Sequence, residues 1–206
     1  MREGFMNAIK ISCFEKYSAL CLTSALALAT NLALGQTNEL AISGHSVYQL
    51  ASDWTTDTGK PIKLAQLRGK PQIAAMIFTT CRGACPLLVQ QMREISQSLP
   101  DSIRTNVGYL LVTFDPERDT QAVLHAYRAA RQLPENQWML VRGRPEDVQE
   151  LALVLGVKYR KDANGQFSHS NIITLLNAEG EIVFQQTRLN GSSGELAQKL
   201  SALLKR

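Results

Sequence analysis

The chain has 206 residues, of which 45% are hydrophobic and 19% charged, and its formal net charge is +4. These values fit one globular domain with an N-terminal extension. The basic residues form no block and do not alternate with aromatic residues, so nothing in the sequence supports nucleic-acid binding. We therefore expect no nucleic-acid partner.

The N-terminus has the pattern of a targeting segment. Arg2, Lys10 and Lys16 precede an uncharged and mostly apolar stretch over residues 17–34, which ends in small residues typical of a signal-peptidase site. We expect residues 1–35 to be a signal peptide, or an uncleaved membrane anchor, because the stretch is almost long enough to span a bilayer. Residues 36–206 then form the folded domain, exported to the periplasm and either free or anchored to the inner membrane.

The mature chain is predicted to begin with a β-hairpin. Residues 46–50 alternate between polar and apolar side chains as a strand does, residues 53–61 have the composition of a turn, and residues 62–64 resume the alternation. A continuous apolar run then predicts a buried strand over residues 73–79.

Two cysteines follow this strand, in the stretch Thr80-Cys81-Arg82-Gly83-Ala84-Cys85-Pro86. Apolar residues at helical spacing from Leu88 onward predict a helix, and Pro86 suits its first turn, so Cys85 is placed at or just before the helix N-terminus. The helix dipole and Arg82 both favour loss of the thiol proton. We therefore expect both thiols to be thiolates near neutral pH.

Cleavage of the targeting segment would remove Cys13 and Cys21 and leave Cys81 and Cys85 as the only cysteines. In an oxidising compartment two such cysteines usually form a disulfide bond. A bridge that closes so short a loop stabilises a fold very little. We therefore interpret the pair as a redox-active or metal-binding dithiol rather than a structural staple.

A second continuous apolar strand is predicted over residues 107–114, and two such strands around one helix indicate a parallel βαβ unit. Asp115 follows the second strand directly, so we expect it at the sheet edge beside the cysteine strand. In the helix that comes next, Asp119 is the predicted N-cap. His125, on the polar flank of that helix, is expected to be an ordinary surface residue.

The remaining elements complete an α/β domain. They are a strand over residues 138–141, a helix over 145–155, a closing hairpin made of strands 171–176 and 182–184, and a final helix over about 195–204. The alternation of strands and helices, without repeats or linkers, predicts a thioredoxin-like fold with an N-terminal β-hairpin and an inserted closing hairpin.

Three sites are candidates for chemistry. Cysteines four residues apart project from the same side of a helical turn, which suits two thiolates around one soft metal ion as well as it suits a disulfide. His169, in a polar stretch predicted to be a loop, is either an ordinary surface residue or the nitrogen ligand that a thiolate pair would need. Asp115 is either a carboxylate that starts a turn or a residue that supports the metal site without binding the metal itself.

These motifs together resemble the SCO/SenC family of copper-binding, thioredoxin-fold assembly proteins. The resemblance is carried, in this order along the chain, by the stretches Phe78-Thr79-Thr80-Cys81-Arg82-Gly83-Ala84-Cys85-Pro86, Phe114-Asp115-Pro116-Glu117-Arg118-Asp119-Thr120 and Ser168-His169-Ser170. It implies that Cys81, Cys85 and His169 bind one copper ion, as Cu(I) or Cu(II). It also implies that Asp115 is tied to copper and redox function.

Two positions depart from the usual family pattern. Ser168 stands where an acidic residue commonly precedes the histidine, and the spacer between the cysteines lacks its usual aspartate. With less negative charge near the metal, cuprous or dithiol chemistry is favoured over a cupric state. The three ligands that the resemblance implies are all present.

The resemblance implies a metallochaperone with a redox-active dithiol rather than a turnover enzyme. Its partner would be the copper-receiving subunit of cytochrome c oxidase, a respiratory oxidase whose copper centre the family helps to build. The alternative is an exported thiol-disulfide oxidoreductase that reduces the cysteines of another exported protein. This second function needs Cys81 and Cys85 but not His169, so the histidine discriminates between the two.

Overall fold

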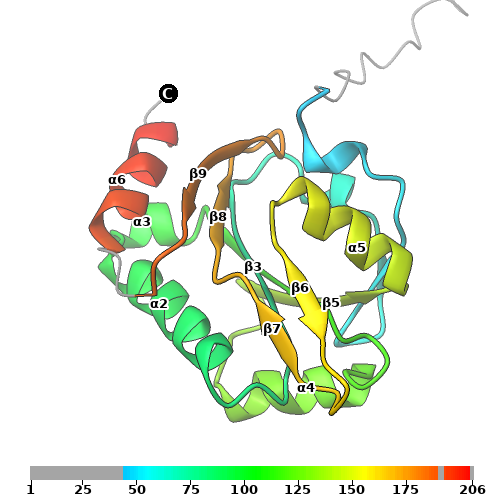
Figure 1. Ribbon diagram of the computed structural model, residues 1–206. Helices are drawn as coiled ribbons and strands as arrows, with labels where there is room; N and C mark the ends of the chain where they lie inside the picture. The colour runs from blue at the N-terminus through cyan, green and yellow to red at the C-terminus, as the bar shows by residue number, and fades with distance from the viewer. Residues whose placement is uncertain (1–43, 190–192, 205–206) are drawn as a thin grey trace, which may run out of the picture. The chain divides into compact units, whose positions relative to one another are not determined.

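The computed structural model describes residues 44–189 and 193–204, and the domain is drawn in Figure 1. The predicted targeting segment, residues 1–35, lies outside these residues. Within the described ranges, no helix combines the length and the apolar composition that crossing a bilayer requires.

The core of the domain is a mixed seven-stranded sheet with the strand order β2-β1-β5-β4-β3-β8-β9. Two further strands, β6 and β7, pair only with each other. The strands are β1 (Trp54–Thr56), β2 (Pro61–Ile62), β3 (Gln72–Ile77), β4 (Gly108–Thr113), β5 (Trp138–Gly143), β6 (Tyr159–Lys161), β7 (Phe167–His169), β8 (Ile173–Leu176) and β9 (Ile182–Gln186).

The centre of the sheet is the predicted parallel pair. Every residue of β3 and β4 is buried, as expected for strands that are covered on both faces. The two strands run parallel and end level with each other, since Ile77 of β3 is paired with Thr113 of β4. The segments that follow them, with Cys81 and Asp115, therefore leave the same edge of the sheet, as predicted.

The helices cover the sheet on both sides. In Figure 1, α2, α3 and α6 gather on one side of the sheet and α5 lies on the other. The helices are α2 (Ala84–Ser98), α3 (Asp101–Arg104), α4 (Gln121–Ala130), α5 (Pro145–Val154) and α6 (Ser193–Leu203), with short 3-10 helices η1 (Val47–Gln49) and η2 (Leu64–Leu67). The closing hairpin is present as the antiparallel pair β8 and β9.

The predicted first strand, residues 46–50, is wrong. Its centre is η1, a 3-10 helix that begins because the Ser46 hydroxyl accepts a hydrogen bond from the backbone N–H of Tyr48. The N-terminal hairpin exists, but its strands lie elsewhere in the sequence. Strand β1 falls within residues 53–61, which were predicted to form the turn, and β2 begins at the last residue of that range. A positive φ of 83° at Gly59 allows the tight connection between them.

The stretch around His169 is also different from the prediction. The expected loop is β7, which pairs antiparallel with β6 to form a two-stranded ribbon in which Tyr159 lies opposite His169. Asp162 and Gly165 close its tip, with Gly165 at a φ of 75°. His169 is therefore held by a strand register rather than by an irregular loop.

Candidate metal centre

The two cysteines lie where the sequence predicts, at the turn from β3 into α2. Cys85 is the second residue of the helix, after an N-cap at Gly83. Both residues are free thiols; Cys81 is half-buried and Cys85 is 0% exposed. The backbone N–H of Cys85 donates to the Cys81 sulfur at 3.5 Å, so the helix N-terminus points a donor at this thiol.

His169 lies against the dithiol. Its Nε2 atom is 3.5 Å from the Cys85 sulfur, and its Nδ1 atom is 3.1 Å from the carbonyl oxygen of Ser170. When Nδ1–H donates a hydrogen bond to that carbonyl, the lone pair of the neutral imidazole lies on Nε2, the atom that faces the Cys85 sulfur. This is the tautomer that a metal ligand needs.

The spacing of the three donor atoms fits a single metal ion. The two sulfurs and the imidazole nitrogen of Cys81, Cys85 and His169 all lie within 4.8 Å of one another. Metal–sulfur bonds of about 2.3 Å in a trigonal arrangement would separate the ligands by roughly 4 Å. Two thiols and one imidazole form a soft donor set, which suits copper better than a hard cation such as Mg²⁺.

Burial, rather than the helix dipole, sets the protonation of Cys85. Removal from water raises the pKa of the Cys85 thiol, and the nearby Cys81 and Asp119 raise it further. Arg82, which was expected to favour the thiolate, is exposed to solvent. The prediction that both thiols ionise near neutral pH is therefore wrong for Cys85 in the metal-free protein, because a charge in an apolar site is costly.

Asp115 lies at the predicted sheet edge, and its side chain is only 2% exposed. The carboxylate pairs with the guanidinium of Arg118 and lies 4.0 Å from the Lys161 ammonium on β6. It is not one of the three residues whose donor atoms converge. Asp115 therefore contacts cations near the site, and its functional role stays a prediction.

Asp119 is the site residue that sequence reasoning misassigned. The N-cap of α4 is Thr120, whose hydroxyl accepts from the backbone N–H of Val123. Asp119 is instead fully buried and accepts hydrogen bonds from the backbone N–H of Thr79 at 3.0 Å and from the hydroxyls of Thr79 and Thr113. It joins the end of β4 to the turn that leads to Cys81.

A cluster of aromatic rings supports His169, and sequence reasoning missed it. The imidazole lies 5.1 Å from the Phe114 ring and 5.9 Å from the Phe78 ring, measured between ring centroids. Phe167 of β7 contacts both of these rings, and Tyr159 of β6 stacks on Phe114. The ribbon therefore packs onto the ends of β3 and β4 through an apolar surface.

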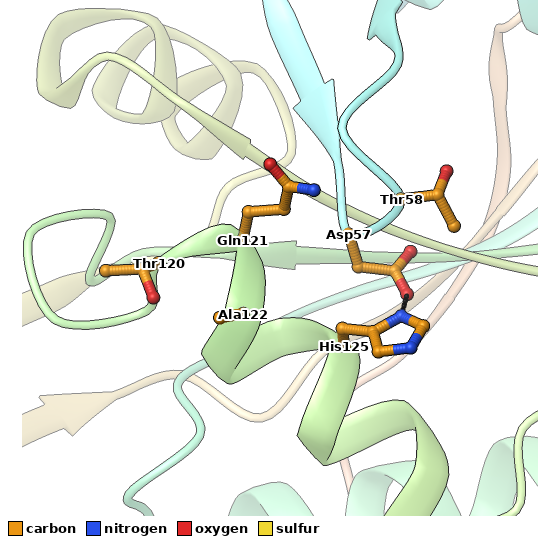
Figure 2. Close-up of a pocket in the computed structure, with 6 residues that line it drawn as sticks. All are labelled: Asp57, Thr58, Thr120, Gln121, Ala122 and His125. Atoms are coloured by element: carbon orange, nitrogen blue, oxygen red, sulfur yellow. Dashed lines mark ion pairs between the residues drawn. The ribbon is translucent and has the colours of Figure 1, made fainter.

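His125 is a surface residue, as predicted. Figure 2 shows its ring against the carboxylate of Asp57, in a hollow lined also by Thr58, Gln121 and the start of α4. Its Nδ1 atom is 3.6 Å from Asp57, and 61% of its side chain is exposed. No cysteine lines this hollow, so His125 serves as a natural control for His169.

The fold and the site together define a class: a thioredoxin-like domain with two thiols and an imidazole converging at the carboxyl edge of its sheet. The sequence profile described as SCO1/SenC matches residues 44–205. The chain belongs to the SCO1/SenC family.

Known relatives agree with this assignment. The SCO1 protein homolog of Bacillus subtilis is 25% identical over 130 residues, which are 61% of this chain and 66% of that protein. The crystal structure of Arabidopsis thaliana ScoI with copper bound has a TM-score of 0.64 and 24% identity, covering 80% of this chain and 99% of that one. BsSco, a member of the Sco family of cytochrome c oxidase assembly proteins with an identified disulfide switch, has a TM-score of 0.65 and 21% identity, covering 74% and 91%. These structures confirm the fold.

Proposed function

We propose that this protein binds one copper ion through Cys81, Cys85 and His169 and delivers it during assembly of the copper centre of cytochrome c oxidase. The observation that carries the proposal is the convergence of the three donor atoms within 4.8 Å. Membership of the SCO1/SenC family and the similarity to a copper-bound ScoI support it.

The electronic character of the site favours Cu(I) as the cargo. Thiolates are soft donors, and the apolar rings of Phe78 and Phe114 lie beside the imidazole. Burial raises the pKa of the Cys85 thiol, so copper must displace a proton from this sulfur when it binds. Loading therefore releases protons and strengthens as pH rises.

The partner and the location follow from the same proposal. The copper acceptor is the copper-receiving subunit of a respiratory oxidase, which must meet the edge of the sheet where Cys81 is accessible. Residues 1–35 export the chain to the periplasm, as a cleaved signal peptide or as an anchor in the inner membrane.

Copper titration of the reduced protein, in competition with a chelator of known affinity, tests this function. His169→Ala is expected to lower copper affinity by about 10–100-fold or more, because one of three ligands is lost. His125→Ala is the matched control and should keep the parent affinity, since it removes an exposed imidazole that lines a hollow without cysteines. Equal affinity in both variants, near that of the parent, would remove His169 from the site.

A thiol-disulfide oxidoreductase is the second candidate, and the contrast between the two thiols favours it. Cys81 is accessible and receives an N–H from Cys85, whereas Cys85 is buried beside it. The Cys81 thiolate would attack a partner's disulfide, which forms a mixed disulfide and releases one partner thiolate. Cys85 would then attack the Cys81 sulfur, which forms the Cys81–Cys85 disulfide and releases the second partner thiolate. The pair would lose two electrons and two protons to form the Cys81–Cys85 disulfide, and the partner would gain both as two thiols.

The same two sulfurs serve both functions, so copper loading and disulfide formation should exclude one another. A disulfide has lost the thiolate charge that holds the metal. Copper stoichiometry is expected to be one per chain in the reduced protein and close to zero after complete oxidation. Tight binding of equal stoichiometry in both samples would show that copper is held elsewhere.

A further inference from the structure

The loop between β4 and α4, residues 114–120, contacts both segments that carry the ligands. Its two aspartates are buried, but their side chains bond to different segments of the chain. Asp119 contacts the turn that leads to the dithiol, whereas Asp115 and Arg118 contact the ribbon that carries His169, through Lys161 and the carbonyl oxygen of Gly165 respectively.

Asp119 holds the dithiol side. Its two carboxylate oxygens accept the backbone N–H and the hydroxyl of Thr79, two residues before Cys81, and also the hydroxyl of Thr113 at the end of β4. The side chain is 0% exposed, and these donors are neutral. A buried carboxylate with three donors fixes the turn strongly, because loss of any partner leaves a desolvated polar group unpaired.

Arg118 holds the histidine side. Its Nε atom donates to Asp115, and its Nη2 atom donates to the carbonyl oxygen of Gly165, at the tip of the ribbon. The guanidinium also lies 5.6 Å from the centroid of the Phe167 ring. Phe167 is two residues before His169 on the same strand, so one side chain contacts both the tip and the packing face of the ribbon.

We propose that this loop is a two-sided clamp that sets the distance between the dithiol and the imidazole. Asp119 is a positioning residue for Cys81 and Cys85, and Arg118, oriented by Asp115, is a positioning residue for His169. This inference rests on the proposed function, because it takes the three residues to be copper ligands. It goes beyond that function by assigning Asp119 to the dithiol and Arg118 to His169.

A double-mutant cycle with His169→Ala separates the two arms. Arg118→Ala should lower the copper affinity of the parent by about tenfold or more, yet cause no further loss when His169 is already absent, because it acts only through the histidine. Asp119→Asn replaces an acceptor with an amide donor facing Thr79 and should lower affinity by a similar factor in both backgrounds. Thr79→Val removes only one of the three hydrogen bonds and gives the second test should Asp119→Asn fail to fold.

Arg160→Ala is the matched control for Arg118. Arg160 is an exposed residue of the same ribbon, on β6, and its replacement should leave copper affinity unchanged. Losses of equal size for Arg118→Ala with and without His169 would overturn the assignment of Arg118 to the histidine. Parent affinity in both Asp119→Asn and Thr79→Val would overturn the assignment of Asp119 to the dithiol.

The alkylation rate of Cys85 in the metal-free protein tests the clamp independently of copper binding. The imidazole of His169 lies against the buried sulfur of Cys85, so release of the ribbon should expose this thiol. In the metal-free, reduced protein, Arg118→Ala should raise the alkylation rate of Cys85 by about tenfold, whereas Arg160→Ala should not. If the parent binds no copper but this difference appears, the proposed function fails and the clamp stands. An unchanged Cys85 rate in a folded Arg118→Ala variant contradicts the clamp.

Discussion

The thiol of Cys85 lies in the first turn of α2 and is also completely buried. The first feature favours the thiolate and the second disfavours it. Burial dominates, because the free energy needed to remove a full negative charge from water is larger than the stabilisation that the partial positive charge of a helix N-terminus provides. The metal-free site therefore keeps a proton on Cys85, which a metal ion must displace when it binds.

This raised pKa predicts a loss of stability at alkaline pH in the reduced, metal-free protein. The folded thiol stays protonated in a range where the unfolded thiol, with a pKa of about 8.5, ionises. The stabilising contribution is complete below that value and is lost as pH rises above it toward the folded pKa. Urea unfolding at pH values on either side of 8.5 measures the effect, and Cys85→Ser, which does not titrate there, should show a smaller decrease. An identical pH dependence in the two proteins would mean that Cys85 does not contribute.

Asp119 and Thr120 show how neighbouring residues divide two tasks that look alike in a sequence. Both are N-cap residue types, but only Thr120 caps α4, while Asp119 turns inward to Thr79 and Thr113. Aspartate and threonine are both favoured at the N-cap position. This local preference cannot reveal that Asp119 pairs with Thr79, which lies 40 positions earlier in the chain. The buried acid was therefore beyond the reach of local sequence reasoning.

Among the secondary-structure elements, the ones with strong periodicity were predicted well. Strands β3 and β4 are continuous apolar runs because helices cover both faces of the sheet there. The first predicted strand failed because Val47 and Tyr48 are adjacent and both buried, so the alternation in the sequence does not correspond to two faces. The ribbon of β6 and β7 was missed because its strands have three residues each and are largely polar; its only clear signal is Asn164-Gly165, a typical hairpin turn.

The start of α4 gives a prediction at the scale of an element. Thr120→Ala should lower the free energy of unfolding by about 0.5–2 kcal/mol, the usual effect of losing a cap. Asp119→Ala should cost more, since it leaves the N–H and hydroxyl of Thr79 and the hydroxyl of Thr113 without their acceptor in a buried site. Urea unfolding of the two variants, with Thr120→Ser as the conservative control, compares them. A larger loss of unfolding free energy for Thr120→Ala than for Asp119→Ala would contradict the buried hydrogen-bonding role assigned to Asp119.

At the scale of the whole domain, a buried ion pair joins the N-terminal hairpin to the rest of the sheet. Asp57, just after β1, accepts from Nε and Nη2 of Arg128 on α4, the second at 2.7 Å. The Nη1 atom of Arg128 also donates to the carbonyl oxygens of Leu133 and Trp138, at 3.3 and 2.8 Å. One guanidinium therefore connects the hairpin turn, the end of α4 and the start of β5.

Replacing Arg128 alone should destabilise the domain more than replacing both partners of this pair. Arg128→Met leaves the carboxylate of Asp57 buried beside the exposed His125 and should cost about 3–5 kcal/mol. Adding Asp57→Asn removes the uncompensated charge and should recover part of that loss, although the carbonyl oxygens of Leu133 and Trp138 still lack their donor. The side-chain hydrogen bonds of Asp57 and Arg128 join each other and the carbonyl oxygens of Leu133 and Trp138 rather than the dithiol, so copper affinity of the folded variants should stay at the parent value. Equilibrium unfolding and copper titration of the single and double variants check both points, and additive losses would show that Asp57 and Arg128 do not stabilise the fold as a pair.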